Sequence, residues 1–555
     1  MTLPYEDVLR RLGAVADRLG LEAYCVGGAV RDALLGRATS DLDFVSVGSG
    51  SGIRWAQAVA KEVGVRTAHV YASFGTAGVH LPPEQFGGAP DEEPLVLEFV
   101  GARRESYDRS SRKPAVEDGT LDDDQRRRDF TINALAVCVN GALDEDGRFG
   151  ELVDPFGGLS DLAAGLLRTP LDPAETFSDD PLRMLRAARF AAQLGFRVDD
   201  AALAAMRQHA DRIAIVSQER ITDELQKLLA APVPSVGFKI LYDTGLLDRI
   251  LPDLTALAGV EEMRGHKHKD NFFHTLEVVD NLAHLQQQQG LAGDRAEGAA
   301  LWTRWAALFH DIAKPDTKRF IRGRGWTFHG HEDRGARRIP KLFRALKLPM
   351  DERLEHVREL VRLHHRPVAL VDDEVTDSAV RRLLFEAGDR IDALMRLVRA
   401  DITSKNPRRV RRYLNAFDRV EAKFAEVEAK DRLRNFQPPV DGYEIMETLG
   451  VTEGVAVGIV KEHIREAILD GDIPNEHDAA FAYMMAMKDE ALRRGALFET
   501  LVRTLQGREK AAIGAIKEEL FWGDVPTDPD AAHAHLMRVK DEALAERFGE
   551  EKAKG

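Results

Sequence analysis

The alternation of apolar and polar positions predicts an α/β arrangement at the start of the chain. Residues 1–20 place apolar side chains at helical spacing between charged ones, which predicts a helix packed on a sheet. From Tyr24 to Val45, one apolar run meets the Gly27-Gly28 turn, a short helix begins near Val30, and a second apolar run follows. This order predicts strand, glycine turn, helix and strand in succession.

The pattern further along predicts more strands and then a long helical remainder. A helix is expected at Trp55–Val63, and strands are expected at Thr67–Tyr71, Ala77–Leu81 and Leu95–Val100. Later apolar positions recur at helical spacing, with one helix expected over Phe177–Phe196. The chain is therefore expected to be mostly α, with an N-terminal α/β head.

Candidate chemistry first appears at the second expected strand. Asp41 and Asp43 lie two residues apart and so project from the same face. Paired carboxylates suit Mg²⁺, which takes its other ligands from water and substrate phosphates. The Gly27-Gly28 backbone can approach a triphosphate, and Arg31 adds positive charge. Each short motif alone also fits an ordinary turn or a solvated strand end, but together they predict a metal-assisted phosphoryl or nucleotidyl transfer site.

A second charged motif runs directly into the apolar stretch ALAVCV, which is unlike a solvated face. Arg127 and Arg128 offer forked donors that suit triphosphate oxygens. Asp129 and Asn133 can hydrogen-bond ribose hydroxyls. This motif therefore predicts a nucleotide-binding surface.

A carboxylate and a guanidinium share one face of the helix expected over Phe177–Phe196. Asp180 and Arg183 stand three residues apart. On periodicity alone, an ordinary ion pair between these two side chains is the favoured interpretation.

Histidines and aspartates recur on successive expected helices in the second half of the chain. A lone histidine on a helix is more often a core residue than a ligand, but this recurrence favours a metal site. Imidazole with carboxylate ligation suits Mn, Ni, Fe or Mg. The residues are His274, His310, Asp311, His329, His331, His364, His365 and Asp401.

Composition limits the kind of protein this can be. The 555 residues are 44% hydrophobic and 30% charged, and no apolar run is long enough to span a bilayer, so we expect a cytoplasmic protein without membrane contact. Cys25 and Cys138 lie in apolar runs and are expected to be buried thiols without redox chemistry. A net charge of −15 means that any RNA contact must use local basic surface.

Two resemblances follow from these motifs. The spacing GGAVRD, LLG, DLDFV, together with RRDFTINA, resembles the class II nucleotidyltransferases, which comprise the tRNA CCA-adding enzymes and bacterial poly(A) polymerases. The order H, HD, H, H, D resembles the HD phosphohydrolase superfamily. Taken together, the chain is most similar to bacterial CCA tRNA nucleotidyltransferases that carry an HD domain.

The first resemblance implies roles for residues of the head and neck. Glu98 matches the third catalytic carboxylate, beside Asp41 and Asp43 as Mg²⁺ ligands. Asp180 and Arg183 match the pair that hydrogen-bonds the base of CTP or ATP, and Arg186 is expected to bind the nucleotide as well. The family usually has Glu where this chain has Asp179, and the basic loop 101–120 matches in position a mobile loop that helps to switch nucleotide choice.

The second resemblance implies a metal-binding set in the HD region. His274, His310, Asp311 and Asp401 would supply the minimal ligands for a divalent ion, Mg²⁺, Mn²⁺ or Ni²⁺. His331 and His364 would complete a second metal position. The suggested substrates are 2′,3′-cyclic phosphates or 2′-nucleotides.

These expectations combine into one organisation. We expect a nucleotidyltransferase head at 1–165, a helical neck at 166–264, an HD domain at 265–430 and a helical tail at 431–555. The implied function is addition of CCA from CTP and ATP to the 3′ end of tRNA, with an additional phosphohydrolase activity. The alternatives are a poly(A) polymerase, an enzyme that adds only CC or only A, and an HD nucleotide phosphohydrolase with a regulatory nucleotide-binding head.

Overall fold

The computed structural model divides into two compact units. The first unit comprises Met1–Arg362 with Ala400–Thr403, and the second comprises Leu363–Arg399 with Ser404–Gly555. The part of the basic loop that holds Arg109, Arg112 and Lys113 lies outside the described residues. The structure describes residues 5–39, 41–71, 75–89, 91–106, 115–144, 147–263, 266–267, 269–292, 296–372, 376–404, 406–431 and 439–549.

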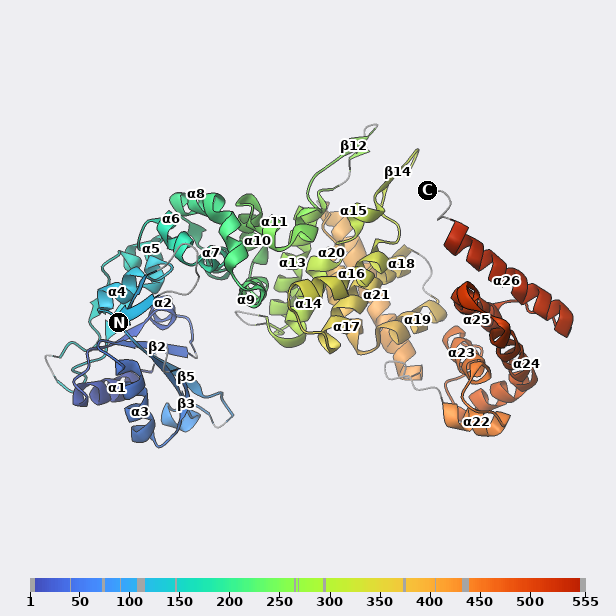
Figure 1. Cartoon of the computed structure of the whole chain (residues 1–555), viewed down its shortest axis with the longest axis horizontal. Coiled ribbons are helices and arrows are strands. Elements are labelled where there is room, and N and C mark those ends of the chain that lie inside the picture. The colour runs from blue at the N-terminus through green and yellow to red at the C-terminus, as the bar shows by residue number, and fades with distance from the viewer. Residues whose placement is uncertain are drawn as a thin grey trace. The chain divides into compact units, whose positions relative to one another are not determined.

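A seven-stranded mixed sheet forms the head (Figure 1). Its strand order is β3-β4-β5-β2-β1-β8-β9, with β2 and β5 parallel and the other neighbours antiparallel. The strands expected from the sequence at β3, β4 and β5 are confirmed to within one residue. The strands are β1 (Ala23–Val26), β2 (Asp41–Ser46), β3 (Thr67–Tyr71), β4 (Thr76–Leu81), β5 (Leu95–Gly101), β8 (Ala136–Cys138) and β9 (Leu152–Val153).

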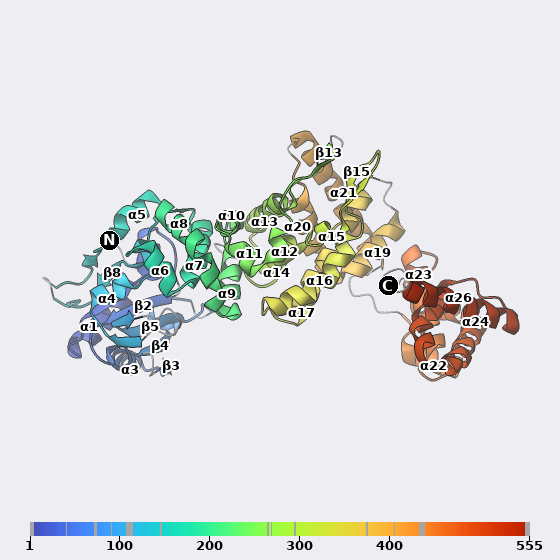
Figure 2. The ribbon, with the colours of Figure 1, turned by 45° about the horizontal axis from the view of Figure 1, so that its top comes forward.

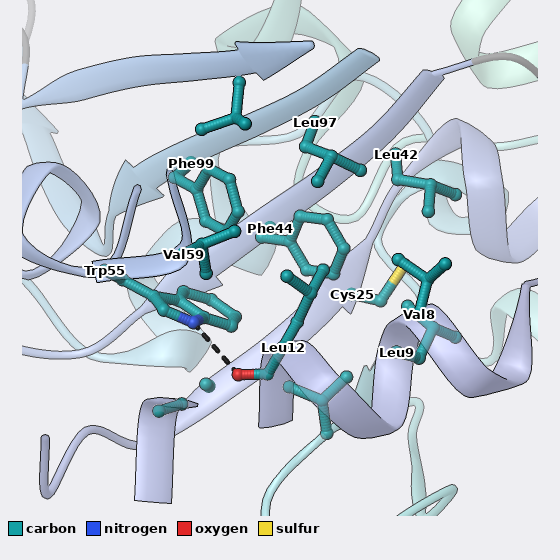
Figure 3. Close-up of a cluster of buried hydrophobic side chains, with 14 of the residues drawn as sticks. Val8, Leu9, Leu12, Cys25, Leu42, Phe44, Trp55, Val59, Leu97 and Phe99 are labelled. Atoms are coloured by element: carbon teal, nitrogen blue, oxygen red, sulfur yellow. Dashed lines mark hydrogen bonds between the residues drawn. The ribbon is translucent and has the colours of Figure 1, made fainter. Parts of the chain in front are cut away.

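The main core of the head lies between one sheet face and two helices, α1 (Glu6–Arg18) and α3 (Ser51–Val63) (Figure 3). Phe44 stacks on Phe99 at a ring distance of 5.1 Å, and Trp55 meets Phe99 edge-on at 4.9 Å. The buried Trp55 indole donates to the Leu12 carbonyl at 3.1 Å. Because Phe44 is held in this core, the alternate residues of β2 project from the opposite face.

Short elements connect the sheet to the neck. The helix α2 (Gly28–Leu34) follows β1, and both free cysteines are buried, as expected from the sequence. The other connecting elements of the head are β6 (Arg103–Ser106), β7 (Ala115–Asp118), α4 (Leu121–Arg126) and the 3-10 turn Thr131–Asn133.

The neck is helical, but the prediction of one continuous helix over Phe177–Phe196 is wrong. α6 (Pro173–Asp179) ends before Asp180, and α7 (Leu182–Leu194) begins after Pro181. Asp180 has φ −131° and ψ 98°, because a residue before proline is pushed out of the helical region. The remaining neck elements are α5 (Gly158–Ala164), β10 (Leu166–Leu167), β11 (Arg197–Val198), α8 (Asp200–His209), α9 (Gln218–Leu229), α10 (Pro234–Asp243), α11 (Leu246–Ile250) and α12 (Pro252–Thr255).

The first unit continues into a second helical region, in which α10 packs on α13 and α9 on α14. Two short β-hairpins, β12–β13 and β14–β15, project from these helices (Figures 1 and 2). The elements are β12 (Glu262–Met263), β13 (His266–Lys267), α13 (Asn271–Gln288), α14 (Gly298–Phe309), α15 (Lys314–Thr317), β14 (Arg319–Ile321), β15 (Gly325–Thr327), α16 (His331–Ala345) and α17 (Glu352–Leu363).

The second unit is helical throughout its described residues. Its last five helices enclose two small apolar cores, which lie around Val460 and around Ile516. No helix among the residues that the structure describes is long and apolar enough to cross a membrane. The sheet of the head and the helices of the remaining chain confirm the expected mostly α fold with an N-terminal α/β head. The helices are α18 (Arg366–Asp372), α19 (Asp377–Ala387), α20 (Ile391–Asp401, whose last two residues belong to the first unit), α21 (Pro407–Asp431), α22 (Gly442–Leu449), α23 (Val455–Asp470), α24 (His477–Thr504), α25 (Ile513–Trp522) and α26 (Pro529–Gly549).

Candidate active sites

Three carboxylates gather on one face of the two parallel strands β2 and β5. Asp43 is directly opposite Glu98 in the strand register, and Asp41 is opposite Val96. Side chains in register on neighbouring strands point to the same side, so Asp41, Asp43 and Glu98 share the face turned away from the aromatic core. Asp41 and Glu98 are exposed, and Asp43 is partly buried.

Electrostatics distinguish Asp43 from an ordinary surface carboxylate. Burial raises the pKa of Asp43 to about 6, while Arg128 opposes this rise and Glu98 and Asp41 add to it. A hard cation bound between neighbouring carboxylates removes the repulsion between their charges, and carboxylate oxygens are its preferred ligands. The residues present therefore fit Mg²⁺.

The turn before α2 brings the backbone against this acidic face. Gly27 has φ 75°, and a Cβ atom there would lie 2.8 Å from Nη1 of Arg128 and 3.7 Å from Oδ2 of Asp43. Only glycine fits this position, because any side chain would be strained and would collide with Arg128. Gly28 then begins α2, so the turn presents backbone next to the carboxylates.

A buried aspartate that the sequence analysis missed orients the two arginines of the RRD motif. Asp124 is fully buried and accepts hydrogen bonds from Arg127 and from Arg128, the latter at 3.0 and 2.9 Å. Burial would raise the pKa of Asp124, but Arg128 and Arg127 lower it below its usual range. The only available signal was its place three and four residues before the arginines on α4.

The polar residues after these arginines form a buried network. Asp129 accepts from Asn133 at 3.0 Å and pairs with Arg186 at 2.6 Å. Asn133 in turn accepts from Arg31 at 2.7 Å, and Arg31 is also paired with Asp32 at 2.8 Å. Although burial opposes it, Arg186 and Asn133 lower the pKa of Asp129 to about 2. The network therefore holds Asp129 ionised beside the arginines.

Asp180 and Arg183 lie near one another but do not form the ion pair that periodicity favoured. Asp180 pairs with Arg220 at 3.1 Å and caps the amide of Leu182 at 3.1 Å. Arg183 is 9% exposed and donates to the carbonyls of Thr176 and Arg127. The break before Pro181 explains this difference, because the two side chains no longer share a helix.

These residues surround one cavity of about 540 Å³. Eight arginines and five aspartates line it, which makes it suited to a polyanion that also needs a metal. Glu98 lies beside Asp43 in the sheet but is not among the lining residues. The charged lining residues are Arg31, Asp32, Arg37, Asp41, Asp43, Arg127, Arg128, Asp129, Asp180, Arg183, Arg186, Arg189 and Arg220, and Gly27, Gly28 and Asn133 line it as well.

A second cluster of ligand-type side chains lies in the same unit, on α13, directly after α14, and on α16 and α20. Nε2 of His274 is 3.0 Å from Oδ1 of Asp401, and Nε2 of His310 is 3.2 Å from Oδ2 of Asp311. His274, His310 and Asp401 each offer one ligand atom within 4.8 Å of the others. Nε2 of His331 approaches Asp311 at 3.3 Å.

Hydrogen bonds on the far side of each ring orient the imidazoles. Nδ1 of His310 lies 2.7 Å from the Ala307 carbonyl, and Nδ1 of His331 lies 2.8 Å from the Phe328 carbonyl. A carbonyl only accepts, so these Nδ1 atoms carry the protons and the Nε2 atoms face the carboxylates. Backbone bonds of this kind are typical of metal-binding histidines, and the donor set fits a divalent ion.

Lys314 and His310 offset the negative charge of Asp311 in the group of His274, His310, Asp311 and Asp401, which we call the HD cluster. Lys314 lies 2.6 Å from Asp311. Burial acts against ionisation, but His310 and Lys314 hold the pKa of Asp311 well below its usual range. Burial lowers the pKa of His310, but the Asp311 carboxylate outweighs it and the net shift is upward. His364 is buried and belongs to the second unit, so its part in a second metal position stays a prediction.

Three family models match the chain in order. They are the poly A polymerase head domain over residues 23–168, a probable RNA and SrmB-binding site of polymerase A over 195–257, and the HD domain over 271–399. An A-adding tRNA nucleotidyltransferase of Deinococcus radiodurans is 32% identical over 471 residues, which cover 82% of this chain and 94% of that protein.

The chain belongs to the class II tRNA nucleotidyltransferase and poly(A) polymerase family. A multifunctional CCA protein of Pseudomonas paraeruginosa is 37% identical over 353 residues, which cover 62% of this chain and 73% of that protein. The family membership that the motifs suggested is thereby confirmed.

Solved structures share the fold of this family member. A CCA-adding enzyme of Bacillus stearothermophilus, solved in complex with CTP, has a TM-score of 0.57 at 24% identity and covers 88% of this chain and 98% of that chain. A Thermotoga maritima CCA-adding enzyme, complexed with tRNA, has a TM-score of 0.53 at 21% identity and covers 86% and 94%.

Proposed function

We propose that this chain adds the CCA sequence to the 3′ end of tRNA from CTP and ATP. The observation that carries the proposal is the position of Asp41 and Asp43 at the wall of an arginine-lined cavity, with Glu98 beside Asp43 in the sheet. The relatives named for CCA addition and for A addition support the same class of reaction.

The reaction is a nucleotidyl transfer. The terminal 3′-hydroxyl of tRNA attacks the α-phosphorus of CTP or ATP, the bond from that phosphorus to pyrophosphate breaks, and pyrophosphate leaves. Asp41 and Asp43 would hold Mg²⁺, which stabilises charge on the attacking and leaving oxygens when bound. Glu98 adds a third carboxylate on the same face.

The arginines of the cavity would bind the triphosphate. Asp124 fixes Arg127 and Arg128 in place, so their outer N–H groups are preorganised for phosphate oxygens. Arg31 contributes charge behind the Gly27-Gly28 turn. The negative members of the lining then keep the total charge of the cavity balanced when metal and nucleotide are both bound.

Residues of the neck would choose the base, and the buried network would hold the ribose. Two carbonyls already fix the guanidinium of Arg183, which leaves its other N–H groups for a base edge. Asp180 pairs with Arg220 just before the start of α7, and Arg186 of this helix pairs with Asp129. Asp129 and Asn133 are the proposed ribose contacts.

A direct test uses the two carboxylates of β2. Asp41→Ala and Asp43→Ala should each abolish nucleotide addition to tRNA, while circular dichroism shows an unchanged helical content, because these side chains lie outside the aromatic core. Asp122→Ala is the matched control, since Asp122 is an exposed aspartate of the head that pairs with Arg126 and does not line the cavity. Near-normal transfer by a folded double variant would refute the assignment.

We infer a second activity for the HD cluster, a metal-dependent hydrolysis of phosphoesters. The supporting observation is the convergence of His274, His310, Asp311 and Asp401 with Nε2 atoms turned inward. A bound divalent ion would supply activation of water. The residues hold and orient this group, and Lys314 beside Asp311 can meet a phosphate oxygen.

The second activity has its own test. The double variant His310→Ala, Asp311→Ala should lose hydrolysis of 2′,3′-cAMP measured with Mg²⁺, Mn²⁺ or Ni²⁺, while nucleotide addition continues. The inference fails if the wild-type protein hydrolyses no such ester with any of these ions, or if the double variant loses nucleotide addition instead.

A further inference from the structure

The β14–β15 hairpin is a basic projection on a chain whose net charge is −15. The nine residues from Lys318 to Trp326, KRFIRGRGW, contain four cations and no acid. On a chain of net negative charge, four cations without an acid concentrate positive charge at this hairpin.

Cross-strand contacts hold the hairpin in shape. Phe320 is opposite Trp326 in the register, and their rings meet edge-on at 5.4 Å. Lys318 lies over the Trp326 ring at 5.0 Å and pairs with Glu261 at 2.6 Å. Because side chains alternate along a strand, Arg319 projects from the face opposite to Phe320.

Three arginines of the hairpin are open to solvent. Arg319, Arg322 and Arg324 are all exposed, and Gly323 forms the turn between the last two with φ 85°. None of the three has an acidic partner within ion-pair distance in the part of the chain that the structure describes. Ile321, between them, is 41% exposed. Uncompensated arginines around a small apolar group suit the phosphates and bases of a nucleic acid strand.

The base of the hairpin is joined to the HD cluster. The hairpin occupies the chain between Asp311 and His331, which approach each other at 3.3 Å. The Phe328 carbonyl, just after β15, lies 2.8 Å from Nδ1 of His331, and Lys314 lies over the Phe328 ring at 5.5 Å. The neighbouring strand β13 contacts β15 (Figure 2) and leads into α13, which carries His274. The base of the β14–β15 hairpin therefore borders the metal-ligand cluster.

We propose that the β14–β15 hairpin binds the phosphate backbone of RNA, so that the HD cluster acts on a phosphate at an RNA 3′ end in preference to a free mononucleotide. The substrate part of this inference rests on the proposed HD activity. The strands of three residues extend the turn about 10 Å from the base of the hairpin. A polynucleotide can contact both the cluster and Arg322 or Arg324, whereas a mononucleotide offers no phosphate beyond the one being cleaved.

The chemistry on a 2′,3′-cyclic phosphate end is balanced with water alone. One water oxygen joins the phosphorus, one of the two ribose P–O bonds breaks, and the freed ribose oxygen takes the proton. The product is a phosphomonoester on the same RNA strand. No oxidant, reductant or second substrate is needed.

The first experiment measures binding without catalysis. Fluorescence anisotropy with a short single-stranded RNA ending in a 2′,3′-cyclic phosphate is recorded in EDTA for the whole chain. The triple variant Arg319→Ala, Arg322→Ala, Arg324→Ala should bind at least tenfold more weakly. Its slope of log affinity against log salt should fall by about two, since each lost phosphate contact on single-stranded nucleic acid removes about 0.7. A circular dichroism melt checks that the variant is folded.

A matched control removes equal charge from the same unit. Arg337→Ala, Lys341→Ala, Arg344→Ala empties three exposed cationic positions of α16. This control variant should keep the wild-type affinity and salt slope. Equal losses of RNA affinity in the two triple variants would show that binding depends on the overall positive charge of the unit and not on the hairpin, and would overturn the proposal.

The second experiment separates the two classes of substrate. Hydrolysis of the RNA end and of 2′,3′-cAMP is compared with the metal present, and the ratio of the two kcat/KM values should fall at least tenfold in the hairpin variant. A wild-type preference for the mononucleotide, or an unchanged ratio, would overturn the substrate assignment. If the wild-type protein hydrolyses neither compound, the proposed HD activity is refuted, and the binding experiment alone decides whether the hairpin contacts RNA.

Discussion

Replacing Asp43 by asparagine should stabilise the metal-free protein at neutral pH. Asp43 is partly buried beside Glu98 and Asp41, and its pKa is raised to about 6 from an ordinary 3.8. When folding raises the pKa of a carboxyl group, the free energy of unfolding of the protein falls as the pH rises from about 4 to about 6. Asparagine has nearly the same shape and no charge, so it avoids that loss.

The magnitude follows from the shift. About two pKa units, at about 1.4 kcal/mol for each unit, set an upper limit of about 3 kcal/mol for the gain above pH 7. The favourable contact with Arg128 is lost in the variant, but Arg128 retains two hydrogen bonds to Asp124. A gain of 1 to 3 kcal/mol would raise the melting temperature of the head by several degrees, roughly 2–4 °C per kcal/mol.

The assay is thermal unfolding in EDTA at pH 4, 6 and 8. Asp43→Asn should melt above the wild type at pH 8 and together with it at pH 4. Asp122→Asn serves as the control, with little change expected from an exposed aspartate that is not among the groups that shift the pKa of Asp43. Added Mg²⁺ should raise the melting temperature of the wild type more than that of Asp43→Asn, because binding to the folded state stabilises it. Equal melting temperatures at pH 8, or a difference that ignores pH, would refute the reasoning.

Three further predictions concern the nucleotide and the RNA. Asp180→Ala and Arg183→Ala should each reduce the selectivity for CTP and ATP over UTP and GTP by about five- to 150-fold, because a lost buried partner costs about 1–3 kcal/mol. Wild-type selectivity in both variants, measured by competition between nucleotides, would rule out base recognition by this pair. Asp124→Asn should raise the KM for nucleotide and lower the free energy of unfolding by about 3 kcal/mol or more, since it leaves Arg127 and Arg128 without their buried anion. An unchanged melting temperature in calorimetry together with an unchanged KM in the addition assay would contradict this. Addition to tRNA and to a minihelix of its acceptor and T arms should be comparable and should weaken with salt, whereas equal activity on unstructured RNA would favour a poly(A) polymerase.

Local patterns predicted the elements whose partners are near in sequence. The period-2 alternation of β2 places Asp41 and Asp43 on one face. Glu98 was identified by the family resemblance, because the local pattern does not show that β5 pairs with β2. These strands read clearly because one face of each is buried against Trp55 and its neighbours. The Gly27-Gly28 pair also predicted the turn, and the φ of 75° at Gly27 is a conformation that favours glycine.

Other features depend on contacts between distant parts of the chain. The break at Asp180 was predictable in principle from Pro181, but helical periodicity on both sides concealed it. Arg189 and Arg220 come from neck helices and line the cavity only because α7 and α9 pack together. Asp124 is the last of three consecutive aspartates, and its burial depends on how α4 packs.

The most direct test of the proposed function follows each nucleotide separately. Purified protein is incubated with tRNA that ends before CCA, after the first C, or after CC, with one labelled nucleotide at a time. The proposal predicts that CTP is added to the first two substrates, that ATP is added only to the third, and that addition then stops. Incorporation of ATP alone, or an adenosine tail that grows on every substrate, would contradict CCA addition.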